Sequence, residues 1–130
     1  MNGNRIVLDA SVLLAIIYQE PGSEKLAPEL LARATVSTVN LVEAQSKLVL
    51  LGWRPEQAWA DAVSLASEIF PFTADHAKAA GSMVAKTRTL GLSLGDRACL
   101  ALALDLKAPV YSADRAWKTL KVGVRIHVIR

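Results

Sequence analysis

The chain alternates short apolar segments with longer helical ones, and this alternation constrains its fold more than any other feature. Five segments rich in Ile, Val, Leu and aromatic residues have the length of strands. They lie at residues 5–9, 34–37, 69–72, 109–111 and 125–129. Strands that alternate with helices predict an α/β fold with a central parallel sheet covered on both faces. The 130 residues suffice for one domain, which we expect to span residues 1–130.

The helical segments carry recognisable start and stop signals. Thr38 is expected as the N-cap of a long helix that Gly52 closes. Ser93 opens a helix that is apolar almost all round, and such a helix should lie deep in the protein. Helices are predicted at residues 10–18, after the turn at 20–23, and at 38–51, 55–68, 74–90, 93 onward and 114–120.

Four acidic residues lie where apolar segments end or helices begin: Asp9, Glu43, Asp96 and Asp114. In open parallel sheets, ligands bind beyond the carboxyl ends of the strands, at the point where the strand order switches. Asp9 and Asp114 would each close a strand at that edge. Two carboxylates about 5 Å apart at an effective dielectric near 20 repel by roughly 3 kcal/mol. Four acids in one cleft therefore repel each other unless a cation joins them.

Three of these acids also have a purely structural interpretation. Asp9 and Asp114 precede helices and have the residue type of an N-cap, whose side chain accepts a backbone N–H. Asp96 follows Ser93 by three residues, which is the spacing of a capping box. Local sequence alone is consistent with either role for each residue.

Glu43 is ambiguous for a different reason. It falls opposite the main apolar face of its helix, on a polar stripe with Asn40 and Lys47. That stripe either faces solvent, with Glu43 and Lys47 as an ion pair one turn apart, or lines a cleft shared with the end of the first strand. The helical wheel does not decide between the two.

The charge of the chain is unevenly distributed. The net charge is +3, but from Lys86 to the end nine basic residues accompany only three acidic ones, two of which are Asp96 and Asp114. A basic section around isolated carboxylates suits a polyanionic substrate whose backbone is held while a metal acts on it. Scattered solubilising lysines and arginines would give the same balance.

The cysteine content and the apolar runs indicate the compartment. Cys99 is the only cysteine, so no intramolecular disulfide can form and a reducing compartment is expected. Its apolar surroundings indicate a core residue rather than a reactive thiol. The apolar run VLLAII is too short to span a bilayer, and the start of the chain lacks the pattern of a signal peptide. We therefore expect a cytoplasmic protein with no membrane partner.

Several familiar chemistries lack their motifs. His76 and His127 are far apart and have no cysteine or histidine partners, so a zinc site is not expected. No glycine-rich phosphate loop follows a strand, and no nucleophile elbow surrounds any serine. The three tryptophans are interpreted as core or interface residues, because no basic residues interleave with them as in a stacking platform.

Taken together, the segments resemble a PIN-domain ribonuclease of the small kind found as VapC toxins in toxin–antitoxin pairs. The resemblance covers nearly the whole chain. It consists of an acid ending the first strand (IVLDASVLLA) and a Glu early in the helix after the second strand (STVNLVEAQ). A third acid opens the long apolar helix (LSLGDRACLALA), and a Ser-x-Asp follows the fourth strand (VYSADRAW). The ordered set implies a three-layer α/β/α fold whose parallel sheet has the strand order 3-2-1-4-5.

The resemblance also implies a metal site. Asp9, Glu43, Asp96 and Asp114 would be the catalytic acids and the ligands of Mg²⁺ or Mn²⁺, hard cations that favour carboxylate and water oxygens. Glu43 would bind the metal directly, act through water, or orient the nucleophile. Ser112 would support the site through its hydroxyl. Three further positions match the family pattern, two of them polar and one apolar: Ser11, Asn40 and Trp117.

By the same resemblance, the chain would be an endoribonuclease that cleaves RNA as the toxin of a toxin–antitoxin pair. Its expected partners are the RNA substrate, a cognate antitoxin protein and a second copy of the chain in a homodimer. Trp53 and Trp59 are candidates for one of the protein interfaces, with burial of at least one of them in the core as the alternative. A non-catalytic PIN-like module that binds RNA or protein would gain little from four repelling acids. A phosphoacceptor signalling domain would have paired early acids and a lysine after its last strand, and neither is clear here.

Overall fold

The computed structural model describes residues 4–130 and contains a five-stranded sheet in which all neighbouring strands are parallel. Residues 1–3 of the expected domain lie outside the described residues. The strands are β1 (Ile6–Leu8), β2 (Ala34–Ser37), β3 (Glu68–Phe70), β4 (Val110–Ser112) and β5 (Ile126–Val128). Their order, β3-β2-β1-β4-β5, confirms the predicted order 3-2-1-4-5. The strand order therefore switches between β1 and β4.

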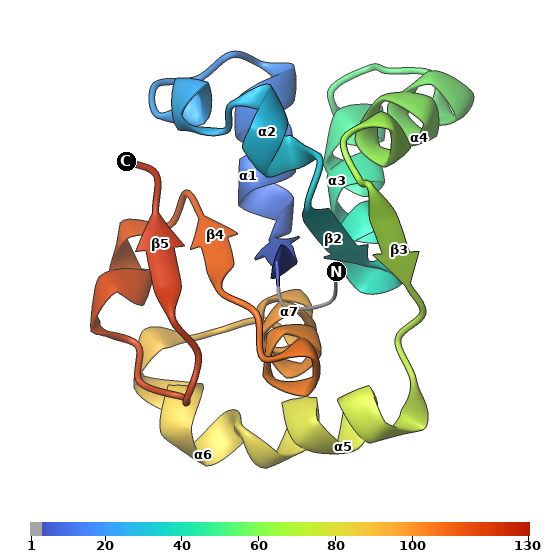
Figure 1. The fold of residues 1–130 in the computed structure, drawn as a ribbon. Coiled ribbons are helices and arrows are strands. Elements are labelled where there is room, and N and C mark those ends of the chain that lie inside the picture. The colour runs from blue at the N-terminus through green and yellow to red at the C-terminus, as the bar shows by residue number, and fades with distance from the viewer. Residues whose placement is uncertain (1–3) are drawn as a thin grey trace.

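Helices cover both faces of the sheet, as the predicted three-layer α/β/α fold requires (Figure 1). In Figure 1, the first four α-helices lie above the sheet and the last three below it. The helices are α1 (Ala10–Ile17), η2 (Ser23–Lys25), α2 (Pro28–Leu31), α3 (Thr38–Leu50), α4 (Pro55–Ser64), α5 (Ala74–Ser82), α6 (Val84–Thr87), η3 (Arg88–Leu90), α7 (Leu94–Leu106) and η4 (Arg115–Thr119), where η marks a 3-10 helix.

The central strand β1 contributes to two separate cores, because successive side chains of a strand point to opposite faces. Ile6 and Leu8 pack with α1, α3 and α4, whereas Val7 packs with α5 and α7. Most of α7 is buried, which confirms the prediction of a deep apolar helix. Burial raises the pKa of the Cys99 thiol well above its ordinary value, as expected of a core cysteine. Within residues 4–130, no helix has the length and apolarity needed to cross a membrane.

The predicted N-cap of α3 is wrong by one residue. Ser37, and not Thr38, caps this helix, since the Ser37 hydroxyl accepts a hydrogen bond from the Val39 N–H (3.2 Å). The Thr38 hydroxyl instead accepts a bond from the N–H of Phe72, just beyond β3 (3.1 Å). The loop that follows β3 is thereby tied to the start of α3.

The helix expected at residues 55–68 ends early, at Ser64. Its predicted last residue, Glu68, belongs to β3 and lies opposite Thr35 of β2. The Glu68 carboxylate also accepts a hydrogen bond from Arg5 at 2.7 Å. Pairing with the edge of the sheet therefore decides the conformation of this residue, and no local pattern shows that pairing.

The helix expected at residues 74–90 is broken into α5, α6 and η3. The break lies at Met83, whose side chain is buried in the core against α7. Arg97 of α7 donates a hydrogen bond to the Ala80 carbonyl, close to this break (3.0 Å). Gly91, with a φ of 63°, ends η3 in the left-handed conformation that glycine adopts without strain. Contacts with α7 therefore accompany the break of the predicted helix at Met83.

Candidate functional site

Asp9 lies at the carboxyl end of β1, where the strand order switches. Its side chain is 3% exposed and caps α1, because Oδ1 accepts a hydrogen bond from the Val12 N–H (3.0 Å). Two hydroxyls donate to the same carboxylate, Ser11 to Oδ1 and Ser112 to Oδ2, each at 2.6 Å. The N-cap interpretation is confirmed, but two further donors and almost complete burial exceed what a cap requires.

The two serines also join the ends of β1 and β4. The Ser11 hydroxyl accepts a hydrogen bond from the Ala113 N–H (2.9 Å), and the Ser112 hydroxyl accepts one from the Asp114 N–H (3.1 Å). Asp114 itself is exposed and caps η4 with its Oδ1. Asp9, Ser112 and Asp114 therefore lie at one edge of the sheet, where the strand order predicted Asp9 and Asp114 to meet.

The environment of Asp9 disfavours its charge. Burial raises the pKa of Asp9 to about 6; the hydrogen bonds from Ser11, Ser112 and Val12 oppose this rise, and the negative charge of Asp96 adds to it. Perturbed carboxylates of this kind gather at functional sites. The ion pairs found among residues 4–130 are Arg5–Glu68, His76–Asp105 and Arg130–Glu20. None of them includes any of the four acids, which therefore have no basic partner among these residues.

Glu43 points from α3 to the start of α7 and is half-buried. Its Oε1 accepts a hydrogen bond from Asn40 Nδ2 (3.0 Å), and its carboxylate lies directly against Gly95. Burial raises the pKa of Glu43; the bond from Asn40 lowers it, the charge of Asp96 raises it and that of Lys47 lowers it. Glu43 and Lys47 do not form an ion pair in the described part of the chain, and the half-buried Glu43 carboxylate lies against α7 rather than in a solvated stripe.

Asp96 forms the capping box that its spacing from Ser93 predicts. The capping box is present: the Asp96 N–H donates to the Ser93 hydroxyl (3.2 Å), and the Ser93 N–H donates to Asp96 Oδ2 (2.9 Å). Asp96 is nevertheless half-buried, and its charge raises the pKa of both Asp9 and Glu43. Asp96 therefore lies near both acids while it caps α7.

The four acids share one region of the fold without forming a closed set of ligands. In the part of the chain that the structure describes, no three Asp, Glu, His or Cys side chains lie close enough together to hold an ion jointly. The chemistry of the donors still fits a hard cation, because the acids and serines of the site offer carboxylate and hydroxyl oxygens. Their unpaired negative charge has the sign that such a cation would neutralise.

A cavity of about 490 Å³ opens beside Asp114, the one of the four acids that lines it, together with Ser11, Ala113, Arg115 and Arg130. A second cavity, of about 480 Å³, shares Arg115 and Arg130 and extends to Lys25 of η2. Arg115 was not among the residues predicted from the sequence, although its position directly after Asp114 is a usable signal. The contact of Gly95 with Glu43 was not predicted either, because no local pattern indicates it.

The tryptophans and His76, also considered from the sequence, make no side-chain hydrogen bond to any of the four acids within the described residues. Trp117 is buried and packs in the core, as expected from the family pattern. Trp53 contacts Tyr18 edge to face, with ring centroids 6.3 Å apart, and Trp59 is exposed. His76 pairs with Asp105 at 2.9 Å, between α5 and α7. Trp59 is therefore exposed to a potential partner, whereas Trp53 is partly buried against Tyr18, and the interface predicted for the two tryptophans stays a prediction.

A parallel α/β sheet with carboxylates at the switch in its strand order defines a class of protein with an acidic site at the carboxyl edge of the sheet. The family model described as the PIN domain matches residues 6–122. The chain therefore belongs to the PIN domain family. No curated protein matches the chain.

Solved structures share this fold at low sequence identity. One of them is VapBC2 from Rickettsia felis, solved with a DNA fragment from its promoter. It aligns with a TM-score of 0.71 and 20% identity over 94% of this chain and 96% of that chain. VapC20 from Mycobacterium tuberculosis, a Sarcin-Ricin loop cleaving toxin, aligns with a TM-score of 0.71 and 19% identity over 92% and 98%. FitAcB from Neisseria gonorrhoeae aligns with a TM-score of 0.71 and 18% identity over 95% and 97%. At these identities the similarity establishes the fold alone.

Proposed function

We propose that the chain is a Mg²⁺- or Mn²⁺-dependent endoribonuclease that acts in the cytoplasm as the toxin of a toxin–antitoxin pair. The observation that carries this proposal is the environment of Asp9. This carboxylate is buried at the switch between β1 and β4, is held by Ser11 and Ser112, and is subject to the charge of Asp96. Among residues 4–130 no basic side chain pairs with it. A hard cation would supply the missing positive charge.

In this proposal, Asp9, Asp96 and Asp114 hold the ion, and Glu43 binds it directly or through water. A bound ion would polarise the phosphodiester and lower the pKa of an attacking water. With a pKa of about 6, Asp9 is mostly ionised at neutral pH and available as a ligand. The two serine hydroxyls donate to different oxygens of Asp9, so they fix the plane of its carboxylate without contributing a competing charge.

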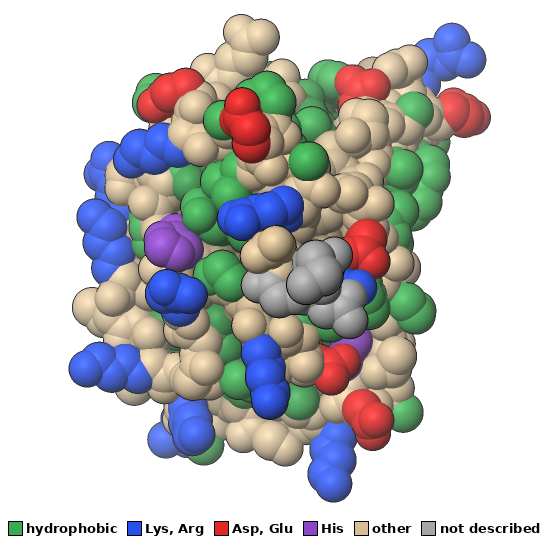
Figure 2. All heavy atoms as spheres, viewed as in Figure 1, with side chains coloured by type: hydrophobic (Ala, Val, Ile, Leu, Met, Phe, Trp, Pro, Cys, Tyr) green, Lys and Arg blue, Asp and Glu red, His purple; other side chains and the backbone are tan. Residues whose placement is uncertain are grey.

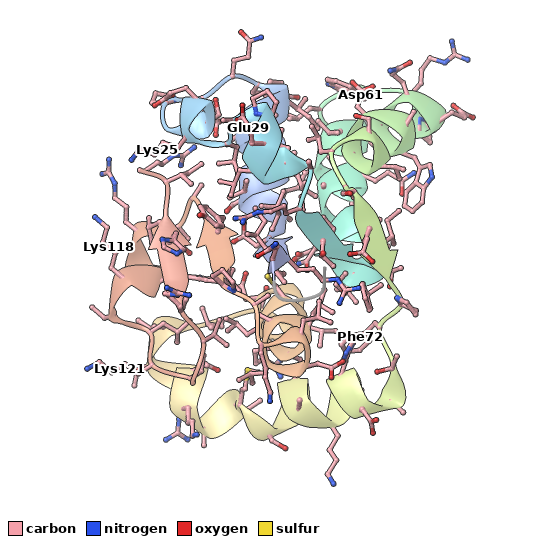
Figure 3. The ribbon with its side chains drawn as sticks, viewed as in Figure 1. Lys25, Glu29, Asp61, Phe72, Lys118 and Lys121 are labelled. Carbon is pink, nitrogen blue, oxygen red and sulfur yellow. The ribbon has the colours of Figure 1, made fainter. Side chains whose placement is uncertain are left out.

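The distribution of basic side chains supports a polyanionic substrate. Figure 2 shows Lys and Arg side chains gathered along the side of the molecule that β5 and η4 form. Lys118 and Lys121 point outward on this side (Figure 3). Arg115 lines both cavities, the first of which also contains Asp114, and Arg130, which lines them too, pairs with Glu20. Arg115 is therefore the basic residue best placed to contact an RNA phosphate next to the acids.

Arg115→Gln is expected to weaken RNA binding by the loss of about one phosphate contact. The slope of log K against log salt concentration should become shallower by about 0.7, the value for one contact to a single strand. Fluorescence anisotropy of a labelled RNA over a salt series measures this slope, in an Asp9→Asn background that prevents cleavage. Lys78→Gln, an exposed position on α5 away from both cavities, should leave the slope unchanged. Equal slopes for both variants would contradict the proposed contact.

The partners in this proposal are a cognate antitoxin and a second copy of the chain. Support comes from the similar structures, several of which are complexes of toxin and antitoxin. Apolar side chains at the end of α3 also lie open to a protein partner, since Leu50 is 85% exposed and Leu51 68% exposed. A single size-exclusion peak at monomer mass over a wide concentration range would rule out a stable homodimer.

The experiment that tests the function is a cleavage assay of the purified protein on tRNA, rRNA and mRNA. We expect cleavage in Mg²⁺ or Mn²⁺, loss of cleavage in EDTA, and recovery when excess metal is added back. Cleavage that persists unchanged in EDTA would contradict metal dependence. If the protein cleaved none of the three RNAs, the proposed nuclease activity would be contradicted.

A non-catalytic module that binds RNA or protein is the second possibility, and one observation favours it. Within the described residues, no three acids lie close enough to hold an ion jointly. Such a module would bind RNA equally well with and without divalent ions. Its RNA affinity would also be unaffected by Asp114→Asn. The same anisotropy measurement, with and without Mg²⁺, distinguishes the two functions.

A further inference from the structure

Asn40 is a buried polar side chain that joins α3 to α7 beside the acids. It is 1% exposed, and its Nδ2 donates both to Glu43 Oε1 (3.0 Å) and to the Gly95 carbonyl (3.1 Å). The first bond stays within α3, and the second crosses to the first turn of α7. One amide group thereby fixes the Glu43 carboxylate relative to the residue that precedes Asp96.

Gly95 borders the same carboxylate on its other side. A Cβ atom built on Gly95 would overlap the carboxyl carbon and both carboxyl oxygens of Glu43. Every other residue type carries a Cβ atom, so only glycine lets this carboxylate lie against the backbone of α7. Glycine is also a poor helix former compared with alanine. The close approach of Glu43 accounts for a residue that helix stability alone disfavours.

The other half of the Asn40 amide has no such role. Its Oδ1 is buried and lacks a hydrogen-bond partner among residues 4–130. A buried acceptor without a partner destabilises the folded state, so an apolar side chain of similar size would serve packing equally well. Thr35 of β2 has the same defect at its Oγ1, but makes no hydrogen bond to any of the four acids. Asn40 differs from Thr35 in its two hydrogen bonds, one to Glu43 and one to the Gly95 carbonyl.

We propose that Asn40 and Gly95 are positioning residues that hold the Glu43 carboxylate at the metal site, and that metal affinity depends on this placement. The inference rests on the proposed function, because it assumes that the acids bind a metal. Asn40 acts by donating a hydrogen bond, and Gly95 acts by leaving room. Asn40→Leu and Gly95→Ala therefore displace the same carboxylate in two independent ways, one by removing a bond and one by a steric push.

Binding of Mn²⁺ to the purified protein, measured from the electron paramagnetic resonance signal of the free ion, tests the inference. Asn40→Leu and Gly95→Ala should each weaken Mn²⁺ binding about tenfold or more, as expected when a metal ligand loses its supporting partner. Melting temperatures should stay close to that of the wild type. Asn40→Leu removes an unsatisfied acceptor, whereas Gly95→Ala moves only the end of a flexible side chain and favours the helix. Thr35→Val, the matched control, should leave Mn²⁺ affinity unchanged.

A Glu43→Gln background separates positioning from a general structural effect. If Asn40 acts through Glu43, then adding Asn40→Leu to Glu43→Gln should cause no further loss of affinity. Additive losses, or wild-type affinity in both Asn40→Leu and Gly95→Ala, would overturn the inference and leave the proposed function standing. A wild-type protein that binds no Mn²⁺ would instead remove the proposed function, and the inference with it.

Discussion

Asp9→Asn is expected to reduce Mg²⁺-dependent RNA cleavage by more than about 100-fold. Substitutions of groups that only support a metal ligand typically cost about 10- to 100-fold, and Asp9 is proposed as a ligand itself. Asparagine has the size of aspartate and can still accept the bond from the Val12 N–H that caps α1. The substitution therefore removes the charge while it keeps the local fold. Single-turnover rates at saturating enzyme separate the chemical step from RNA binding.

The matched control for this substitution is Asp75→Asn. Asp75 is exposed in the first turn of α5, so its variant loses the same charge away from the acids. It should cleave RNA at the wild-type rate. If Asp9→Asn cleaved RNA as fast as Asp75→Asn, then Asp9 would not be catalytic and the assignment of the site would be refuted.

Asp9 should also make the metal-free protein less stable as the pH rises. Burial raises its pKa from 3.8 to about 6 in the folded state, so the folded state binds more protons than the unfolded state between these values. The stabilisation from the protonated form is complete below the unfolded pKa and is lost as the pH rises through the folded pKa. At neutral pH the buried charge therefore costs about 3 kcal/mol of unfolding free energy.

The comparison of wild type with Asp9→Asn isolates this contribution, because the other titrating groups are the same in both proteins. The unfolding free energy of Asp9→Asn relative to that of the wild type should rise by about 2 kcal/mol between about pH 4.5 and about pH 7.5. Urea denaturation in EDTA measures both values. A difference that does not change with pH would show that Asp9 titrates near its ordinary pKa, contrary to the buried environment described above.

The strand order and the meeting of Asp9 with Asp114 could be anticipated from the chain. Apolar segments with the length of strands alternate with helices, and parallel strands end at the same edge of their sheet. The family resemblance supplied the order of the strands, and the structure confirms it. The support of Ser112 for Asp9 was likewise expected, and its hydroxyl does donate to that carboxylate at 2.6 Å.

The helix boundaries and the environment of Glu43 could not be anticipated, because contacts distant in sequence decide them. Asn40 and Gly95, whose hydrogen bond fixes the surroundings of Glu43, are 55 residues apart. A helical wheel of α3 shows only residues of α3, so it cannot show that Gly95 of α7 lies beside Glu43. For Asp96, the spacing from Ser93 predicts a capping box, and the structure contains it. The same spacing gives no sign that the charge of Asp96 raises the pKa of Asp9 and of Glu43. In the fold, Asp96 both caps α7 and lies near two of the other acids.

The position of Mn²⁺ in crystals of the metal-loaded protein is the decisive test of a metal site at Asp9, since anomalous scattering locates this ion without reference to any assay. We predict an anomalous peak at the carboxyl edge of β1, within about 2.2 Å of an Asp9 carboxylate oxygen. A carboxylate of Asp96 or Asp114 should coordinate the same ion. A fully occupied Mn²⁺ bound elsewhere, with Asp9 still bonded only to Ser11, Val12 and Ser112, would refute the proposed site.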